Sequence, residues 1–210
     1  MSLYTDRREG GRELSKFIQD KIEIDSVVIP YQGALPVALE VGKRHNTGLS
    51  LRLADFIRVE NQLSANIGAV AQDGTLWIEE ELREELGVSS SHIEDQANEI
   101  SPALLKESAS HDLGKKDDLK GQKVAVVSEG ISSGFREAAV AGSLLKAGAG
   151  QINVIAPFKS RKHMADLESL ADNVLTVRDL TFISSPEACY ASESGGLSRL
   201  NRREDPKVQL

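Results

Sequence analysis

Residues 126–139, VVSEGISSGFREAA, join a short apolar run to a helix-like segment through a loop of small residues. Five residues form the loop: Gly130, Ile131, Ser132, Ser133 and Gly134. Glu129 precedes it and Arg136 follows it. Small residues let backbone N–H groups approach a ligand closely, and the start of a helix carries a partial positive charge. The loop therefore suits a phosphate, with serine hydroxyls as further donors and Arg136 as a fixed positive charge.

Two common phosphate-binding motifs do not match this loop. The P-loop pattern requires a lysine where Phe135 stands, and the dinucleotide pattern G-x-G-x-x-G requires a third glycine. A strand-to-helix turn that is merely capped by a serine is the structural alternative. Glu129 favours a ligand with two polar parts, because a carboxylate beside a phosphate repels it unless the carboxylate binds something else. A ribose 5′-phosphate offers hydroxyls to the carboxylate and a phosphate to the loop.

The elements around this loop alternate between short apolar runs and helical patterns. The apolar runs predict strands over Lys123–Val127, Ile152–Ala156 and Val174–Val177. Helical spacing predicts helices from Ser133 to Gly148 and over 161–170. Such alternation is typical of βαβ units in a parallel sheet whose strands are buried on both faces.

The first half of the chain repeats this pattern. It predicts a helix over 8–22, a strand over Ser26–Ile29, a helix over 36–45 and a strand over 49–58. Ligands of open parallel sheets bind at the carboxyl ends of the strands. The loop after Ile29, with Tyr31, Gln32 and Gly33, is therefore the second candidate loop.

The segment between these halves reads as an insertion. Two apolar runs around Asp73-Gly74 predict a β-hairpin over 67–78. A helix over 79–86 follows, and a second helix runs from the serines at 89–91 to near Pro102, with a continuation after the proline left open. An exposed loop follows over 107–120. We expect one domain over 1–191, with an insertion at about 65–118 and a polar, flexible tail over 192–210.

Composition excludes several classes of protein. Hydrophobic residues make up 40% of the chain and charged residues 27%, which is ordinary for a globular protein. The net charge of −7 argues against a partner that is nucleic acid or an anionic membrane. Cys189 is the single cysteine, so no disulfide framework forms within the chain. With no signal-like or membrane-spanning apolar run, we expect a cytoplasmic protein.

The stretch VVSEGISSG resembles the signature of the type I phosphoribosyltransferases, in which a hydrophobic strand, two acids and a small-residue loop with [ST]-G precede a helix. Further blocks resemble a subgroup of predicted phosphoribosyltransferases of about this length. These blocks are Asp6-Arg7-Arg8 with Gly10-Gly11, Pro30–Val41, Ile67–Gly74 and Glu81–Val88. The resemblance spans roughly residues 4–190, with the blocks in the subgroup's order.

The resemblance implies an α/β, Rossmann-like fold, in which helices flank a parallel five-stranded sheet and a small hood covers the site. It implies an enzyme that uses phosphoribosyl pyrophosphate (PRPP) and Mg²⁺ to transfer ribose 5-phosphate to a nitrogenous base, with release of pyrophosphate. The ligand is then a phosphorylated ribose or a nucleotide. Dimers are common in proteins of this kind, so a homodimer is one expected assembly.

The resemblance also assigns roles to residues. Glu129 is the catalytic carboxylate, which contacts the ribose hydroxyls together with Ser128 and contacts the metal indirectly. Gly130–Gly134 and Arg136 hold the 5′-phosphate. The pyrophosphate lies against the second loop, formed by Tyr31, Gln32 and Gly33.

The chain departs from the family pattern at three places. Ser128 stands where the pattern has an acid, the loop at 31–33 lacks an arginine, and Ala54-Asp55 replace a basic pair. These changes leave two hypotheses open. One is a phosphoribosyltransferase with an unusual site, and the other is a non-catalytic homologue that senses a nucleotide or PRPP.

Overall fold

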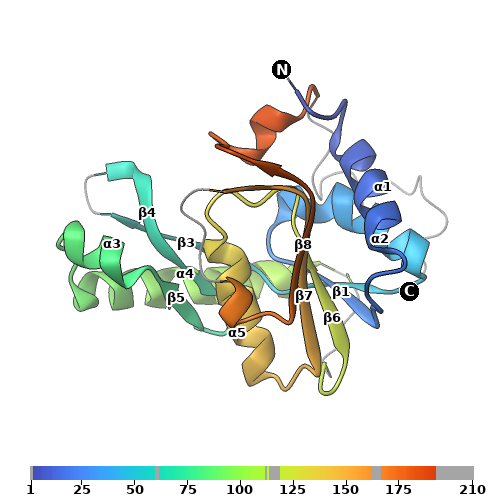
Figure 1. Ribbon diagram of the computed structural model, residues 1–210. Coiled ribbons are helices and arrows are strands. Elements are labelled where there is room, and N and C mark those ends of the chain that lie inside the picture. Colours follow the sequence, from blue (N-terminus) through green and yellow to red (C-terminus); the bar gives the residue numbers. More distant parts are fainter. Residues whose placement is uncertain (1, 60–61, 112, 114–118, 162–166, 193–210) are drawn as a thin grey trace.

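The computed structural model, which describes residues 2–59, 62–111, 113, 119–161 and 167–192, contains two β-sheets (Figure 1). The larger sheet is parallel and has the strand order β2-β1-β6-β7-β8. Its strands are β1 (Ser26–Ile29), β2 (Leu49–Leu51), β6 (Lys123–Val127), β7 (Gln151–Ser160) and β8 (Asn173–Leu180). The smaller sheet is antiparallel and consists of β3 (Ala54–Val59), β4 (Gln62–Ala71) and β5 (Leu76–Ile78). The predicted α/β fold with five parallel strands is confirmed.

Helices cover both faces of the larger sheet (Figure 1). Successive side chains of a strand point to opposite faces. Accordingly Val27 and Ile29 pack against α1 (Arg7–Ile18) and α2 (Leu35–His45), whereas Val28 packs against α5 (Phe135–Lys146). Because neither face of the central strands β1 and β6 meets water, their buried residues form continuous apolar runs rather than alternating ones.

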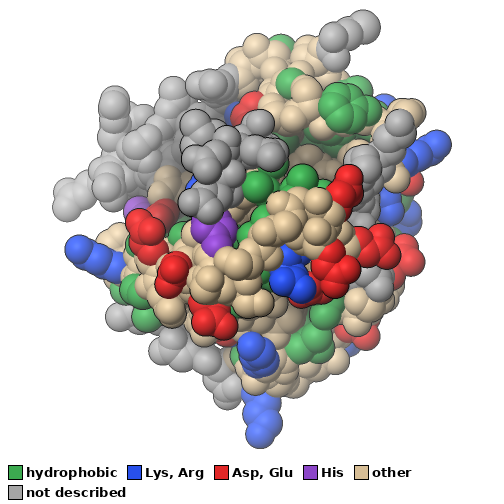
Figure 2. All heavy atoms as spheres, turned by 90° about the vertical axis from the view of Figure 1, so that its left-hand side faces the viewer, with side chains coloured by type: hydrophobic (Ala, Val, Ile, Leu, Met, Phe, Trp, Pro, Cys, Tyr) green, Lys and Arg blue, Asp and Glu red, His purple; other side chains and the backbone are tan. Residues whose placement is uncertain are grey.

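Helix α5 lies between the two sheets (Figure 1). Ala69 and Ala71 of β4 share one apolar core with Val140 and Leu144 of α5. The helices α3 (Glu80–Glu85) and α4 (Ser90–Ser110) pack on the other side of the smaller sheet. Figure 2 views the molecule from this side and shows carboxylate side chains spread over its surface. Within the described ranges, no helix combines the length and apolarity that a membrane span requires.

Several predicted boundaries are wrong. The strand predicted over 49–58 is two strands in different sheets, because the chain leaves the larger sheet after Leu51 and the side chain of Arg52 binds α5 through Ser143. The first helix ends at Ile18. Helix α4 continues past Pro102 to Ser110, so the predicted loop starts later. Pro102 is exposed, so water can satisfy the carbonyl group that loses its helical partner there.

Other predictions fall partly on residues outside the described ones. Of the helix predicted over 161–170, the structure describes a 3₁₀ turn at Leu167–Ser169, and residues 162–166 lie outside the description. Residues 193–210 of the predicted tail also lie outside it. The hairpin around Asp73-Gly74 is confirmed as β4 and β5, with Gly74 in the left-handed conformation. The division into one domain with an insertion stays a prediction.

Asp73 attaches this hairpin to α5. Its carboxylate accepts hydrogen bonds from the Ser143 hydroxyl at 2.6 Å and the Thr75 amide at 3.1 Å, and it lies 3.3 Å from the Arg52 guanidinium. We expect Asp73→Ala to lower the free energy of unfolding by about 1–3 kcal/mol, because two partly buried donors lose their acceptor. Urea denaturation measures this loss. The control Glu80→Ala removes an exposed ion pair and should cost less than about 1 kcal/mol.

The same carboxylate makes stability depend on pH. Burial raises the pKa of Asp73, but the hydrogen bonds from Ser143 and Thr75 and the charge of Arg52 outweigh burial and lower it overall. The unfolded state therefore binds more protons between the two pKa values. The stabilisation is present above the unfolded pKa of about 3.9 and is lost as the pH falls through the folded value. In Asp73→Asn this pH dependence should be absent.

Candidate functional site

The two predicted loops meet where the strand order reverses. The chain proceeds outward from β1 to β2 on one side and from β6 through β7 to β8 on the other, so the carboxyl ends of β1 and β6 are neighbours. Such a switch point is where open α/β sheets bind ligands. The loops touch through Gly33, where an added Cβ would lie 2.6 Å from Oε1 of Glu129. A side chain at position 33 would therefore displace the carboxylate.

The first half of the loop after β6 is fixed by β7. The Ser128 amide donates to the Ile155 carbonyl at 3.0 Å, and the Ile131 amide donates to the Phe158 carbonyl at 3.0 Å. Gly130 lies against the buried ring of Phe158, since a Cβ there would be 2.2 Å from a ring carbon. The loop is consequently held in one conformation by backbone hydrogen bonds and by close packing.

The rest of the loop leaves its backbone donors unpaired. No acceptor among the described residues binds the amides of Gly130, Ser132, Ser133 or Gly134. Gly134, with φ 78°, is the N-cap residue of α5, and no described side chain caps this helix. The structural alternative of a serine cap is therefore wrong. Unpaired amides at a helix N-terminus are suited to an anion.

Arg136 lies between the two loops and the smaller sheet. Its guanidinium carbon is 3.6 Å from the centroid of the Tyr31 ring and 4.5 Å from that of the Phe56 ring. Within the described part of the chain no carboxylate forms an ion pair with Arg136. The second loop lacks an arginine of its own, but its tyrosine stacks on one that α5 supplies. Two rings thus hold a positive charge beside both loops.

Glu129 is buried, with 2% of its side chain exposed, and it forms an ion pair with Arg7 of α1. Burial raises the pKa of the Glu129 carboxyl, and the hydrogen bond and charge of Arg7 oppose this rise. The Tyr190 hydroxyl donates to the backbone carbonyl of Glu129, and the Arg7 guanidinium lies 5.1 Å from the centre of the Tyr190 ring. No pattern in the sequence indicates this pairing, since 122 residues separate Arg7 from Glu129.

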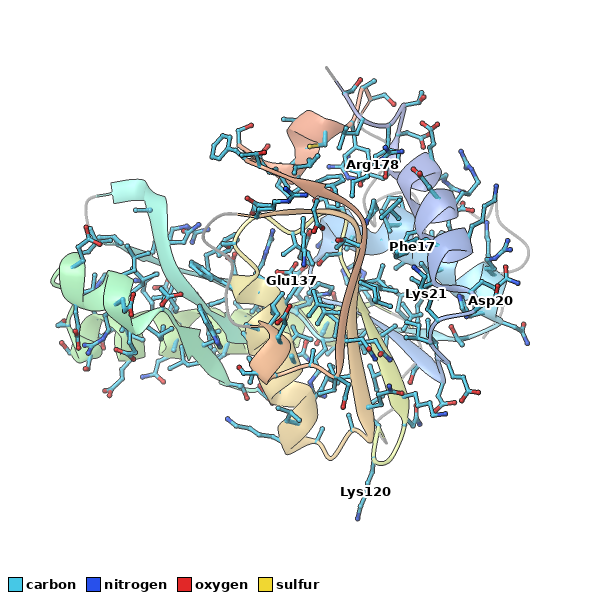
Figure 3. The ribbon with its side chains drawn as sticks, viewed as in Figure 1. Phe17, Asp20, Lys21, Lys120, Glu137 and Arg178 are labelled. Atoms are coloured by element: carbon cyan, nitrogen blue, oxygen red, sulfur yellow. The ribbon has the colours of Figure 1, made fainter. Side chains whose placement is uncertain are left out.

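Ser128 donates its hydroxyl hydrogen bond to the Glu137 carboxylate. Both residues are buried, and Glu137 lies near the start of α5 beside the larger sheet (Figure 3). A carboxylate from the helix is therefore present next to the position where the family pattern has an acid. Sequence analysis missed Glu137 because an acid in the first turn of a helix is common for reasons of the helix dipole alone.

The remaining residues of the second loop face α4 and the interior. The Gln32 side-chain amide donates to the Glu107 carboxylate of α4, which ties the loop to that helix. The Tyr31 hydroxyl is buried, and no described residue lies in hydrogen-bonding geometry with it. Burial raises the pKa of Tyr31 far above its usual value, so the phenol stays neutral.

Comparison with known proteins bears on this arrangement. No protein-family model matches the chain. TT1426 from Thermus thermophilus has a similar structure, with a TM-score of 0.71 and 22% identity over 93% of each chain. The chain therefore shares its fold with TT1426.

Two further structures are similar to the chain over most of its length. A hypothetical protein from Neisseria gonorrhoeae with bound ppGpp has a TM-score of 0.50 and 13% identity, covering 87% of this chain and 89% of its own. A purine phosphoribosyltransferase from Pyrococcus horikoshii has a TM-score of 0.47 and 11% identity, covering 84% of this chain and 83% of its own. Identities this low leave the activity of the chain open.

The residues at the carboxyl ends of β1 and β6 do not fit Mg²⁺ in the conformation described. Magnesium requires an octahedral set of oxygen ligands. Glu129 is already paired with Arg7, and Ser128 with Glu137. Across the described ranges, no three His, Cys, Asp or Glu side chains gather in a metal-binding group. Mg²⁺ stays a prediction of the resemblance.

Proposed function

We propose that this protein binds a nucleotide, or another 5′-phosphorylated ribose compound, with the phosphate on the loop Gly130–Gly134. The set of unpaired amides at the start of α5 carries the proposal. A phosphate group accepts hydrogen bonds from several such amides at once, and the helix N-terminus stabilises its negative charge. The hydroxyls of Ser132 and Ser133 are partly exposed and supply further donors. A protein of similar fold is known with bound ppGpp, which agrees with a phosphorylated ligand.

Binding without transfer is the function that the contacts of Glu129 support best. Its carboxylate is paired with Arg7 and covered by the second loop, so it does not face a bound sugar. Phosphoribosyl transfer is the second candidate. The position of Arg136 on Tyr31 favours it, because this places a cation at the loop that the resemblance assigns to pyrophosphate.

One assay separates the two functions. The protein is incubated with PRPP, Mg²⁺ and a panel of purine and pyrimidine bases, and pyrophosphate release is followed over time. We expect the wild-type protein to release no more pyrophosphate than the Gly134→Val control. In calorimetry, the same wild-type protein should bind AMP. Pyrophosphate release that depends on a base would show transfer and would reject a purely binding function.

Arg136 provides the charge of the proposed site. We expect Arg136→Met to weaken the binding of ribose 5-phosphate by about tenfold or more, since a hydrogen bond to a charged group is lost. Arg136→Lys should fall between the two, because lysine keeps the charge and loses the planar stacking. Isothermal titration calorimetry measures the affinities. Arg44→Met, on the exposed end of α2, is the matched control. If Arg136→Met and wild type bound ribose 5-phosphate with equal affinity, Arg136 would not be part of the site.

A further inference from the structure

Two segments of the described chain, residues 3–5 and 183–192, form a hood over Glu129. The amide of Leu3 donates to the carbonyl of Cys189 at 2.8 Å, and the amide of Ala191 donates to the carbonyl of Tyr4 at 2.9 Å. The rings of Tyr4 and Tyr190 stack at 5.8 Å, and both pack on Phe158 below the phosphate loop. The hood is therefore a paired and packed structure.

Glu129 is the point where the hood meets the phosphate loop. Arg7 binds its carboxylate and begins α1 directly after the first hood segment. Tyr190 of the second hood segment binds its carbonyl. The other carboxylate oxygen, Oε1, lies against Gly33. Three elements thus enclose the side chain, and 2% of it reaches the surface.

We infer that Glu129 anchors the hood to the phosphate loop and does not recognise ribose hydroxyls. To reach a sugar, the carboxylate would have to leave Arg7. Separating a buried ion pair costs about as much as hydrogen bonds from two hydroxyls to a carboxylate return, so the exchange brings no net affinity. Ser128, the other residue on the ribose side, already donates to Glu137. Both side chains that could bind the ribose hydroxyls are therefore already bonded to other protein residues.

The ligand class follows from this, provided that the proposed function holds. Recognition rests on the phosphate, which meets unpaired amides and Arg136. The hydroxyls at the 2′ and 3′ positions contribute nothing to affinity. The site accordingly takes phosphomonoesters of ribose and deoxyribose alike, unlike a site in which a free carboxylate binds the ribose diol.

Calorimetry with two pairs of ligands tests the inference on the wild-type protein. The pairs are ribose 5-phosphate with 2-deoxyribose 5-phosphate, and AMP with 2′,3′-dideoxyadenosine 5′-monophosphate. We expect affinities within about twofold in each pair, whereas a lost hydrogen bond to a carboxylate would weaken binding by about tenfold or more. Weaker binding of both deoxy ligands by tenfold would overturn the inference and leave the proposed function standing. Binding of none of the four would refute the proposed function itself.

Hydrogen exchange of the hood provides a second readout. If Glu129 keeps its contacts, saturation with ribose 5-phosphate should leave the exchange rates of the Leu3 and Ala191 amides within about twofold of those in the free protein. A carboxylate that turns toward the sugar would release Arg7, which lies beside the first hood segment, and the Leu3 amide would then exchange at least tenfold faster. Such an acceleration would overturn the inference even if all four ligands bound equally well.

Discussion

A Gly134→Val variant is expected to fold and to lose about 100-fold or more in affinity for ribose 5-phosphate. Gly134 has φ 78°, a left-handed conformation that a β-branched residue adopts only with strain. Relief of the strain requires the backbone to rotate at the residue where α5 begins. The rotation turns the loop amides away from one another, so they no longer converge on one phosphate. Titration calorimetry measures the loss.

The matched control is Gly148→Val at the other end of α5. Gly148 has nearly the same φ, 79°, and lies at the end of the helix remote from the loop. Each variant should lower the free energy of unfolding by about 1–3 kcal/mol through backbone strain. If Gly148→Val also abolished binding, the effect of Gly134→Val would reflect general destabilisation. If Gly134→Val bound ribose 5-phosphate as tightly as wild type, the loop would not be part of the binding site.

An Arg7→Met variant should lower the free energy of unfolding by about 3–5 kcal/mol, because it leaves the buried Glu129 without its partner. The double variant Arg7→Met/Glu129→Met should recover most of this loss, since two apolar side chains replace the pair without leaving a charge. Urea denaturation of the two single variants and the double variant completes a mutant cycle.

Arg8→Met is the control for this second prediction. Arg8 is the next residue in α1, and its ion pair with Glu40, at 3.5 Å, is partly exposed to solvent. Exposed pairs contribute little, so its loss should cost less than about 1 kcal/mol. If Arg7→Met were as mild as Arg8→Met, Glu129 would not anchor the hood.

The sequence predicts the framework of this protein because the framework rests on local patterns. The continuous apolar runs at 27–29 and 124–127 are buried on both faces, and this burial is why they carry no polar residue facing water. The loop at 130–134 is also predictable, since a close backbone approach to Phe158 and a positive φ both require glycine.

The contacts within the site could not be predicted, because they join residues that are distant in the chain. Nothing near Arg7 indicates that it pairs with Glu129, and nothing near Arg136 indicates that two rings, on Tyr31 and Phe56, hold it. The change of sheet after Leu51 depends likewise on contacts of Arg52 with α5. Such pairings follow from the topology of the fold, which brings separate elements to one sheet edge.

The central claim is that a ribose 5′-phosphate binds to the loop after β6. An amide ¹H–¹⁵N correlation spectrum recorded during titration with ribose 5-phosphate tests it most directly. The structure predicts saturable shifts of the loop amides, namely those of Gly130, Ser132, Ser133 and Gly134, while the amides of α3 stay in place. Saturable shifts confined to other parts of the chain, or no shift at millimolar ligand, would contradict it.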